Sequence, residues 1–137
     1  MRPPEEVKRI LVGQWLAKAA QDLAAAEALL ATDPPLLYPA CFHAQQTAEK
    51  FLKALLTFHQ VEFPKTHSIG ELLDLTARVA PELATELRDA VSLTPYGVEL
   101  RYPGDAPEPD LAEARRALAL ARSVRDAVLA QIPSCST

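Results

Sequence analysis

Apolar residues recur along the first part of the chain at alternating steps of four and three positions. The stretch from about Glu5 to Ala31 keeps this spacing and stops before the prolines at 34 and 35. Its apolar positions are Val12, Leu16, Ala19, Leu23, Ala26 and Leu30. Because this spacing places one apolar stripe along a helix, we predict a long amphipathic helix here.

The same period returns in two further stretches. A second helix is predicted from about Pro39 to Gln60, since proline is tolerated in the first turn of a helix. Its inward positions are Cys41, Ala44, Ala48, Phe51, Leu55 and Phe58. A last helix is predicted to end near Ile132. Its inward positions are Leu111, Ala114, Leu118, Ala121, Val124 and Val128.

A capping signal marks the start of a third, shorter helix. Ser68 and Glu71 match a capping box, in which each of the two side chains satisfies a free backbone N–H at the helix start. The inward face of this helix would consist of Leu72, Leu75 and Val79. Asp110 with Glu113 gives a similar cap for the last helix.

Prolines delimit the rest of the chain. Pro81 opens a fourth segment that ends near Leu93, and residues 94–109, which are rich in Pro and Gly, form the longest irregular stretch. Long loops of this kind in small domains are often functional. We therefore predict an all-α, up-and-down antiparallel bundle of about five helices, formed by a single domain over residues 1–137 with a flexible tail from about 133.

Composition narrows the function classes. The 49% apolar share is mostly Ala and Leu, which favours helices, and the net charge of −4 argues against a protein that coats nucleic acid. A local basic pocket remains compatible with that charge. No run approaches the roughly 18 apolar residues of a membrane span, and the charged start lacks the apolar stretch of a signal peptide. We expect a soluble, cytoplasmic protein.

The two cysteines, Cys41 and Cys135, are not spaced as a zinc site. Cys41 lies among apolar residues and is expected to pack as a small hydrophobe. A disulfide between the two stays open, although a reduced setting is the simpler reading. No glycine-rich phosphate loop, metal-ligand spacing or catalytic triad motif is present, so we expect no metal, no cofactor and no catalytic residue.

The second predicted helix has the most suggestive polar face. His43, Gln46, Lys50 and Lys53 follow one another at steps of three, four and three, so they share one side of the helix. Imidazole, amide and ammonium groups together suit a phosphate or another subunit. The alternative is a solvated face with a Glu49–Lys53 ion pair.

Three residues outside that helix are further candidates. His67 precedes the Ser68 cap, where it either contacts an anionic ligand or anchors the turn by a hydrogen bond. In the long loop, Arg101 and Tyr102 offer a guanidinium and an aromatic ring for a phosphate or a base. The alternative is that Tyr102 packs on the bundle while Arg101 pairs with an acidic neighbour.

Four arginines occur on the last predicted helix. They are Arg115, Arg116, Arg122 and Arg125. Because Glu113 and Asp126 are interspersed among them, a solvated or interface-rim face is favoured over a nucleic-acid stripe.

Several segments together resemble the HEPN family of prokaryotic proteins. Residues 15–23 (WLAKAAQDL) look like the opening helix of that family, and residues 42–56 (FHAQQTAEKFLKALL) resemble its most recognisable segment. The Thr-His turn at 66–67 and the Arg-Tyr-Pro segment at 101–103 also match, in the expected order.

The resemblance implies a helical bundle that forms a homodimer or a larger oligomer. It also implies a frequent partner, a minimal nucleotidyltransferase encoded by the adjacent gene, often as a toxin–antitoxin pair. Nucleotide binding is proposed for the family, and many members are metal-independent ribonucleases that use an Arg followed, after four to six residues, by a His.

This chain departs from the ribonuclease pattern. Its histidines, at 43, 59 and 67, all precede Arg78, and no histidine follows Arg101. We therefore expect a non-catalytic HEPN protein that binds a nucleotide-like ligand, a nucleotidyltransferase partner or both. RNA is a less favoured ligand. The alternatives are a divergent ribonuclease that uses His43 or His67, and a purely structural interaction module.

Overall fold

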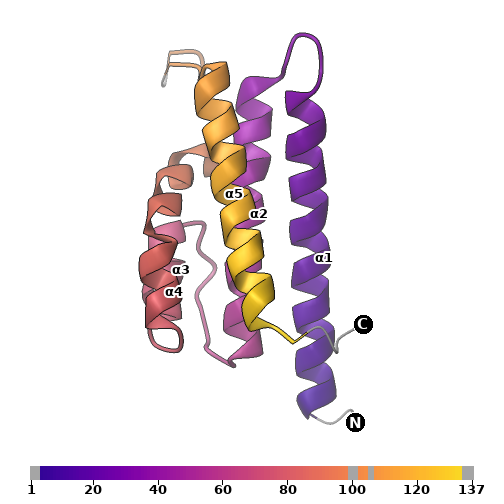
Figure 1. Cartoon of the computed structure of the whole chain (residues 1–137), viewed down its shortest axis with the longest axis vertical. Helices are drawn as coiled ribbons and strands as arrows, with labels where there is room; N and C mark the ends of the chain where they lie inside the picture. The colour runs from indigo at the N-terminus through magenta and orange to yellow at the C-terminus, as the bar shows by residue number, and fades with distance from the viewer. Residues whose placement is uncertain (1–3, 99–101, 105–106, 134–137) are drawn as a thin grey trace.

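The computed structural model describes residues 4–98, 102–104 and 107–133, and within them the chain is helical without strands (Figure 1). There are three long helices, and three shorter helical elements lie between the second and the third of them. The elements are α1 (Pro4–Leu30), α2 (Leu37–Phe58), α3 (Ile69–Thr76), α4 (Pro81–Glu86), the 3₁₀ helix η1 (Arg88–Gly97) and α5 (Leu111–Gln131). The predicted all-α bundle is confirmed.

The long helices lie side by side, with α2 at the centre. Figure 1 shows α1 running antiparallel to α2 and to α5, while α3 and α4 cover the other side of the bundle. Leu52, Leu55 and Leu56 of α2 are fully buried, as expected for a helix that is enclosed by α1, α5 and η1. No helix in the described part of the chain is long and apolar enough to cross a membrane.

The predicted stripes supply most of this core. In α1, Val12, Ala19, Leu23 and Ala26 are buried, and in α2 all the predicted inward residues except the half-buried Phe58 are buried. Two predicted inward residues are exposed instead, because each lies at or beyond a helix end. Val79 follows the end of α3 and Leu111 begins α5, so the helical period does not carry either side chain inward.

Both predicted caps form, one of them differently from the expected capping box. The carboxylate of Asp110 accepts the Glu113 N–H at 2.8 Å, and the Ser68 hydroxyl accepts the Glu71 N–H at 3.2 Å. The Ser68 N–H, however, donates to the Thr66 hydroxyl at 3.0 Å, and that hydroxyl donates to the Glu71 carboxylate at 2.8 Å. Thr66 thus stands between the two partners of the box, because a hydroxyl can accept and donate at once.

The irregular stretch begins later than predicted. Residues 94–97 belong to η1, which includes Pro95. Leu93, which is fully buried, anchors this helix in the core, and the Tyr38 hydroxyl of α2 donates to the Val98 carbonyl at 2.6 Å. These tertiary contacts hold the proline-containing segment in a helical form that its sequence disfavours.

Candidate functional site

The polar side chains of α2 gather around two carboxylates. The first group, here called the Asp22 cluster, consists of Asp22 on α1 with His43 and Lys50 on α2. The second, the Glu49 cluster, consists of four residues. They are Glu49, Gln45 and Lys53 on α2 and His67 in the connection to α3. Each cluster therefore combines one carboxylate, one imidazole and one ammonium group.

In the Asp22 cluster both carboxylate oxygens accept a hydrogen bond. Oδ1 accepts from Nδ1 of His43 at 2.8 Å, and Oδ2 accepts from Nζ of Lys50 at 2.5 Å. The side chains of His43 and Lys50 remain 32% and 22% exposed, whereas that of Asp22 is 11% exposed. The carboxylate thus lies behind two cationic or polar groups that reach solvent.

The hydrogen bond to Asp22 fixes the orientation of the His43 ring. An ionised carboxylate only accepts hydrogen bonds, so Nδ1 carries the hydrogen. Nε2 is then the ring nitrogen left for another group. The same reasoning applies to His67, whose Nδ1 lies 2.9 Å from Oε1 of Glu49.

The Glu49 cluster is much more deeply buried. The Glu49 carboxylate, 3% exposed, accepts from Lys53 at 2.9 Å, from His67 at 2.9 Å and from Gln45 at 3.2 Å. Burial alone would raise the pKa of Glu49, but the hydrogen bonds from Lys53, His67 and Gln45 outweigh it and hold that pKa below its ordinary value. The carboxylate is therefore ionised near neutral pH.

Lys53 is confined by aromatic rings as well as by its ion pair. Its Nζ lies 5.5 Å from the centroid of the Trp15 ring and 5.8 Å from that of Phe63. The side chain is only 9% exposed. The predicted Glu49–Lys53 pair therefore forms, but the expectation that it lies on a solvated face is wrong.

Gln46 lies one turn of α2 from both His43 and Lys50, and its side chain contacts the Glu49 cluster. It is half-buried on α2 and donates from Nε2 to Oε1 of Gln45 at 2.7 Å. Gln45 in turn donates to the backbone carbonyl of His67 at 3.0 Å. The four residues predicted on one face of α2 are thus divided between an accessible and a buried group.

His67 makes the hydrogen bond that the turn-anchoring interpretation expected. Its side chain nevertheless remains 71% exposed, so Nε2 is accessible beside the start of α3. Sequence reasoning had assigned no role to Asp22, Gln45 or Glu49 in ligand binding, although they position these histidines and lysines.

The long loop is only partly described. Arg101 lies outside the described residues. Tyr102 is 69% exposed, so the alternative in which it packs on the bundle is wrong. The residues just before the loop do contact α2: a Cβ on Gly97 would lie 3.1 Å from the side chain of Gln45. A side chain at this position would press against Gln45, so glycine permits the close approach.

Among the described residues, the other reactive side chains do not form a second candidate site. Burial, together with the nearby Glu113 carboxylate, raises the pKa of the Cys41 thiol to about 11, so the thiol stays protonated. No group of His, Cys, Asp and Glu suited to a metal ion occurs among the described residues. Cys135 lies outside the described residues.

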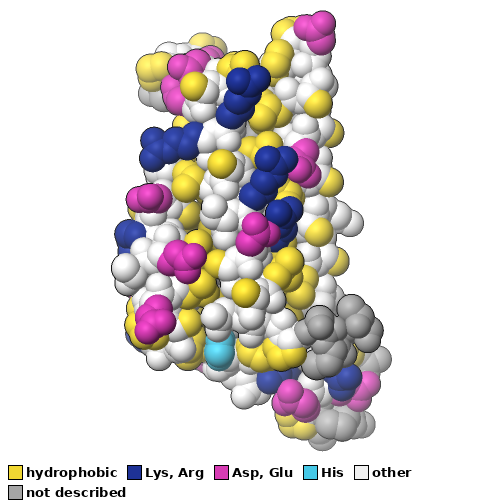
Figure 2. Space-filling view, viewed as in Figure 1, with side chains coloured by type: hydrophobic (Ala, Val, Ile, Leu, Met, Phe, Trp, Pro, Cys, Tyr) yellow, Lys and Arg dark blue, Asp and Glu magenta, His cyan; other side chains and the backbone are white. Residues whose placement is uncertain are grey.

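Helix α5 lies on the face of the molecule that Figure 2 shows, where Lys and Arg side chains stand among Asp and Glu side chains. Arg122 pairs with Glu27 at 2.5 Å and Arg125 with Asp126 at 2.8 Å. This mixed pattern agrees with a solvated or interface-rim face and offers no continuous basic stripe for a nucleic acid.

Comparisons with known proteins agree with the architecture. The sequence model of the HEPN domain family matches residues 12–131 of this chain. Among solved structures, the chain is similar to the crystal structure of TT1696 from Thermus thermophilus, with 30% sequence identity and a TM-score of 0.69. That similarity covers 88% of this chain and 98% of the other. The comparison with curated proteins finds no match.

Proposed function

The chain belongs to the HEPN domain family, and from this premise we propose that it binds a nucleotide-like ligand as a non-catalytic subunit. The Asp22 cluster is the site. The observation that carries the proposal is that the Asp22 carboxylate holds Nδ1 of His43 at 2.8 Å and Nζ of Lys50 at 2.5 Å, while both side chains reach solvent. Side chains held in place in this way lose little conformational freedom when an anion binds, and His43 then donates from Nε2 as an imidazolium.

This proposal assigns a different position relative to the ligand to each of four other predicted residues. Gln46 borders the Asp22 cluster and is expected at the edge of the ligand. His67 offers Nε2 from the neighbouring loop. Tyr102, and Arg101 beside it, are proposed to approach the ligand from the long loop, where an aromatic ring suits a base and a guanidinium suits a phosphate. Lys53 is omitted, because its ammonium is enclosed by Glu49, Trp15 and Phe63.

The test is a calorimetric titration with a panel of nucleotides at low salt. Wild-type protein is expected to bind at least one nucleotide, and His43→Ala is expected to bind it at least about tenfold more weakly with an unchanged unfolding midpoint. Tenfold corresponds to about 1.4 kcal/mol, within the range for a charge-assisted hydrogen bond. Absence of binding to every nucleotide would contradict the proposal.

A second candidate function has one observation in its favour. The Asp22–His43 hydrogen bond resembles the carboxylate–imidazole pair that orients a general base in hydrolytic enzymes. A divergent metal-independent ribonuclease would use Nε2 of His43, or of His67. Cleavage of RNA in the presence of a chelator that is lost in His43→Ala or His67→Ala would support this candidate; intact RNA would favour the non-catalytic role.

The proposed protein partner is the minimal nucleotidyltransferase that accompanies many members of the family, in some cases as a toxin–antitoxin pair. Co-expression with the product of the adjacent gene, followed by affinity purification, tests it. A stable complex that is weakened by substitutions in the Asp22 cluster would assign the partner to this face. A complex that is insensitive to them would place the partner elsewhere.

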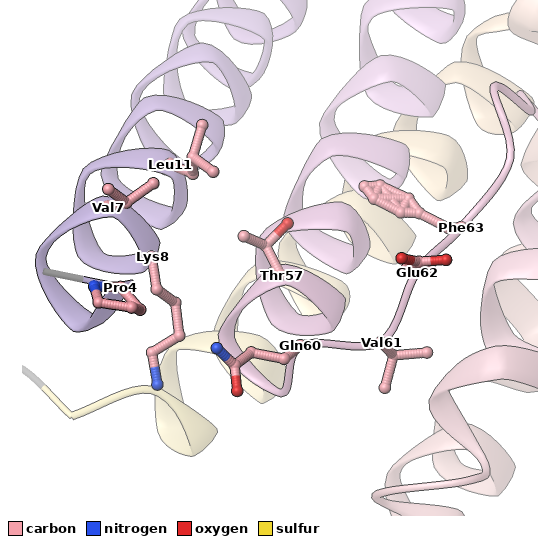
Figure 3. Close-up of a pocket in the computed structure, with 9 residues that line it drawn as sticks. All are labelled: Pro4, Val7, Lys8, Leu11, Thr57, Gln60, Val61, Glu62 and Phe63. Atoms are coloured by element: carbon pink, nitrogen blue, oxygen red, sulfur yellow. The ribbon is translucent and has the colours of Figure 1, made fainter. Parts of the chain in front are cut away.

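We also propose self-association, with a second copy of the chain covering a groove at one end of the bundle. The groove, about 780 Å³, lies between the first turns of α1 and the end of α2 with its following loop (Figure 3). Val7 and Leu11, on its α1 wall, are 41% and 43% exposed. Because an isologous contact uses the same patch on both copies, the exposed Val7 and Leu11 of each copy would be buried together.

A pair of leucines provides a matched test of this groove. Leu11→Asp is expected to yield a monomer in light scattering, while Leu129→Asp, at a 45% exposed leucine on α5, is expected to leave the oligomer intact. The opposite result would place the interface beside α5. A wild-type protein that stays at 14.9 kDa at micromolar concentration would contradict self-association itself.

A further inference from the structure

We propose that Lys18 of α1 completes a binding site for a terminal phosphate together with Lys50 and His43. This inference rests on the proposed function and names the part of the ligand that the Asp22 cluster holds. The sequence patterns assign no role to Lys18. Its position follows from the contacts between α1 and α2.

Two contacts fix the register of these antiparallel helices. Trp15 of α1 lies against Lys53 of α2, with Nζ 5.5 Å from the ring, and Asp22 of α1 contacts Lys50 at 2.5 Å. Lys18 stands between Trp15 and Asp22 in the sequence. It is therefore level with the turn of α2 that carries Lys50 and Lys53. It is also four residues before Asp22, which places both on the same side of α1.

The charges around Asp22 do not balance. The carboxylate already accepts from His43 and Lys50 through its two oxygens, and the charge of Lys53 is matched by Glu49. Lys18 is exposed, and its ammonium has no ion pair or hydrogen bond within the described residues. Two ammonium groups thus accompany one carboxylate, in a chain whose net charge is −4.

This local excess of positive charge suits an anion. Lys18 and Lys50 are donors, and the acceptor oxygens of Asp22 are occupied. His43, whose Nδ1 hydrogen goes to Asp22, donates from Nε2 as an imidazolium, in which both ring nitrogens carry hydrogen. An oxyanion accepts hydrogen bonds and carries negative charge, so a group of cationic donors fits the phosphate end of a ligand better than its base. A terminal phosphate carries between one and a half and about two negative charges near pH 7, more than a phosphodiester, and is therefore the better match.

The experiment compares the binding of pyrophosphate, AMP and adenosine by calorimetry at low salt. Wild-type protein is expected to bind pyrophosphate and AMP but not adenosine. Lys18→Ala is expected to weaken both affinities at least about tenfold, and Lys18→Arg to retain most of the binding because it keeps the charge. The control is Lys65→Ala, which removes another exposed lysine, in the loop after α2, and is expected to change affinity less than about twofold.

The outcomes separate this inference from the proposed function. If Lys18→Ala binds AMP as wild type does while His43→Ala has lost binding, the inference is wrong and the proposed function stands. If pyrophosphate binding depends on Lys18 but no nucleotide binds, the phosphate site stands and the nucleotide function fails. Equal affinity for adenosine and AMP would overturn the phosphate assignment, and absence of any binding would overturn both.

Discussion

The Asp22 and Glu49 clusters contain the same three chemical groups in different surroundings. In each, a carboxylate accepts from Nδ1 of a histidine and from the ammonium of a lysine. The ammonium is 22% exposed beside Asp22 and 9% exposed beside Glu49, where two aromatic rings cover it. Similar residues on one helix therefore have different surroundings, which is why we propose ligand binding for the first cluster and stabilisation for the second.

The energetic reason is the cost of leaving a charge without a partner. When one partner of a buried ion pair is removed, the other charge stays in a low-dielectric environment, and the loss is typically about 3–5 kcal/mol. A pair that reaches solvent contributes about 0–1 kcal/mol because water replaces the lost partner. The loss of stability caused by a substitution should therefore be larger in the Glu49 cluster than in the Asp22 cluster.

The largest effect is expected for Glu49→Gln. The variant leaves the Lys53 ammonium enclosed by Trp15 and Phe63 without a counter-charge, so the free energy of unfolding should fall by about 3–5 kcal/mol. Urea denaturation followed by circular dichroism measures it. Adding Lys53→Met to this variant should recover part of the loss, because the buried charge is then removed. A loss below about 1 kcal/mol would show that the Glu49 cluster is not structural.

The pH dependence of stability should also be traceable to Glu49. Because its pKa is lowered in the folded protein, ionisation stabilises the fold above the unfolded pKa of about 4.3, and this contribution is lost as pH falls through the folded pKa. Unfolding midpoints between pH 7 and pH 3 should therefore decline less steeply in Glu49→Gln than in wild type. Parallel declines in the two proteins would contradict this assignment.

A smaller effect on stability is expected for Asp22→Asn. The side chains of His43 and Lys50 reach water, so the free energy of unfolding should fall by about 1 kcal/mol or less. Nucleotide affinity should fall at least about tenfold, because asparagine has one acceptor oxygen in place of two and no longer holds both donors. Thermal unfolding and calorimetric titration of the same sample check both expectations. A large loss of stability with intact binding would contradict this assignment, because it would make the Asp22 cluster structural.

The histidines give the smallest expected difference in stability. His67→Ala and His43→Ala each remove one hydrogen bond to a carboxylate from a side chain that is 71% or 32% exposed, so each should cost below about 1 kcal/mol. The two should differ in local protection, since His67 ties the loop before α3 to Glu49. Hydrogen exchange should become faster in residues 61–68 only in His67→Ala. Equal exchange in the two variants would remove that distinction.

The sequence predicted the helices well because their apolar stripes and caps are local signals. The caps at Ser68 and Asp110 and the stripes of α1 and α2 depend on residues within a few turns of one another. The same pattern failed for Val79 and Leu111, which are exposed, because the helical period does not predict burial at a helix boundary.

The division of the polar face of α2 was not predictable in the same way. Lys50 and Lys53 have equivalent positions in the helical pattern, and only the fold brings Trp15, 38 residues away in the sequence, over Lys53. Asp22 reaches His43 across 21 residues and Lys50 across 28. Such long-range pairs decide which polar group is accessible, and one sequence contains no direct signal for them.

The most direct measurement is nucleotide titration of two matched lysine variants, Lys50→Met and Lys53→Met, each first confirmed as folded. They remove the same group from adjacent turns of α2. We expect Lys50→Met to bind at least about tenfold more weakly than wild type with nearly unchanged stability, and Lys53→Met to bind with wild-type affinity although it unfolds more readily. Loss of binding in Lys53→Met with full binding in Lys50→Met would contradict the assignment of the ligand to the Asp22 cluster.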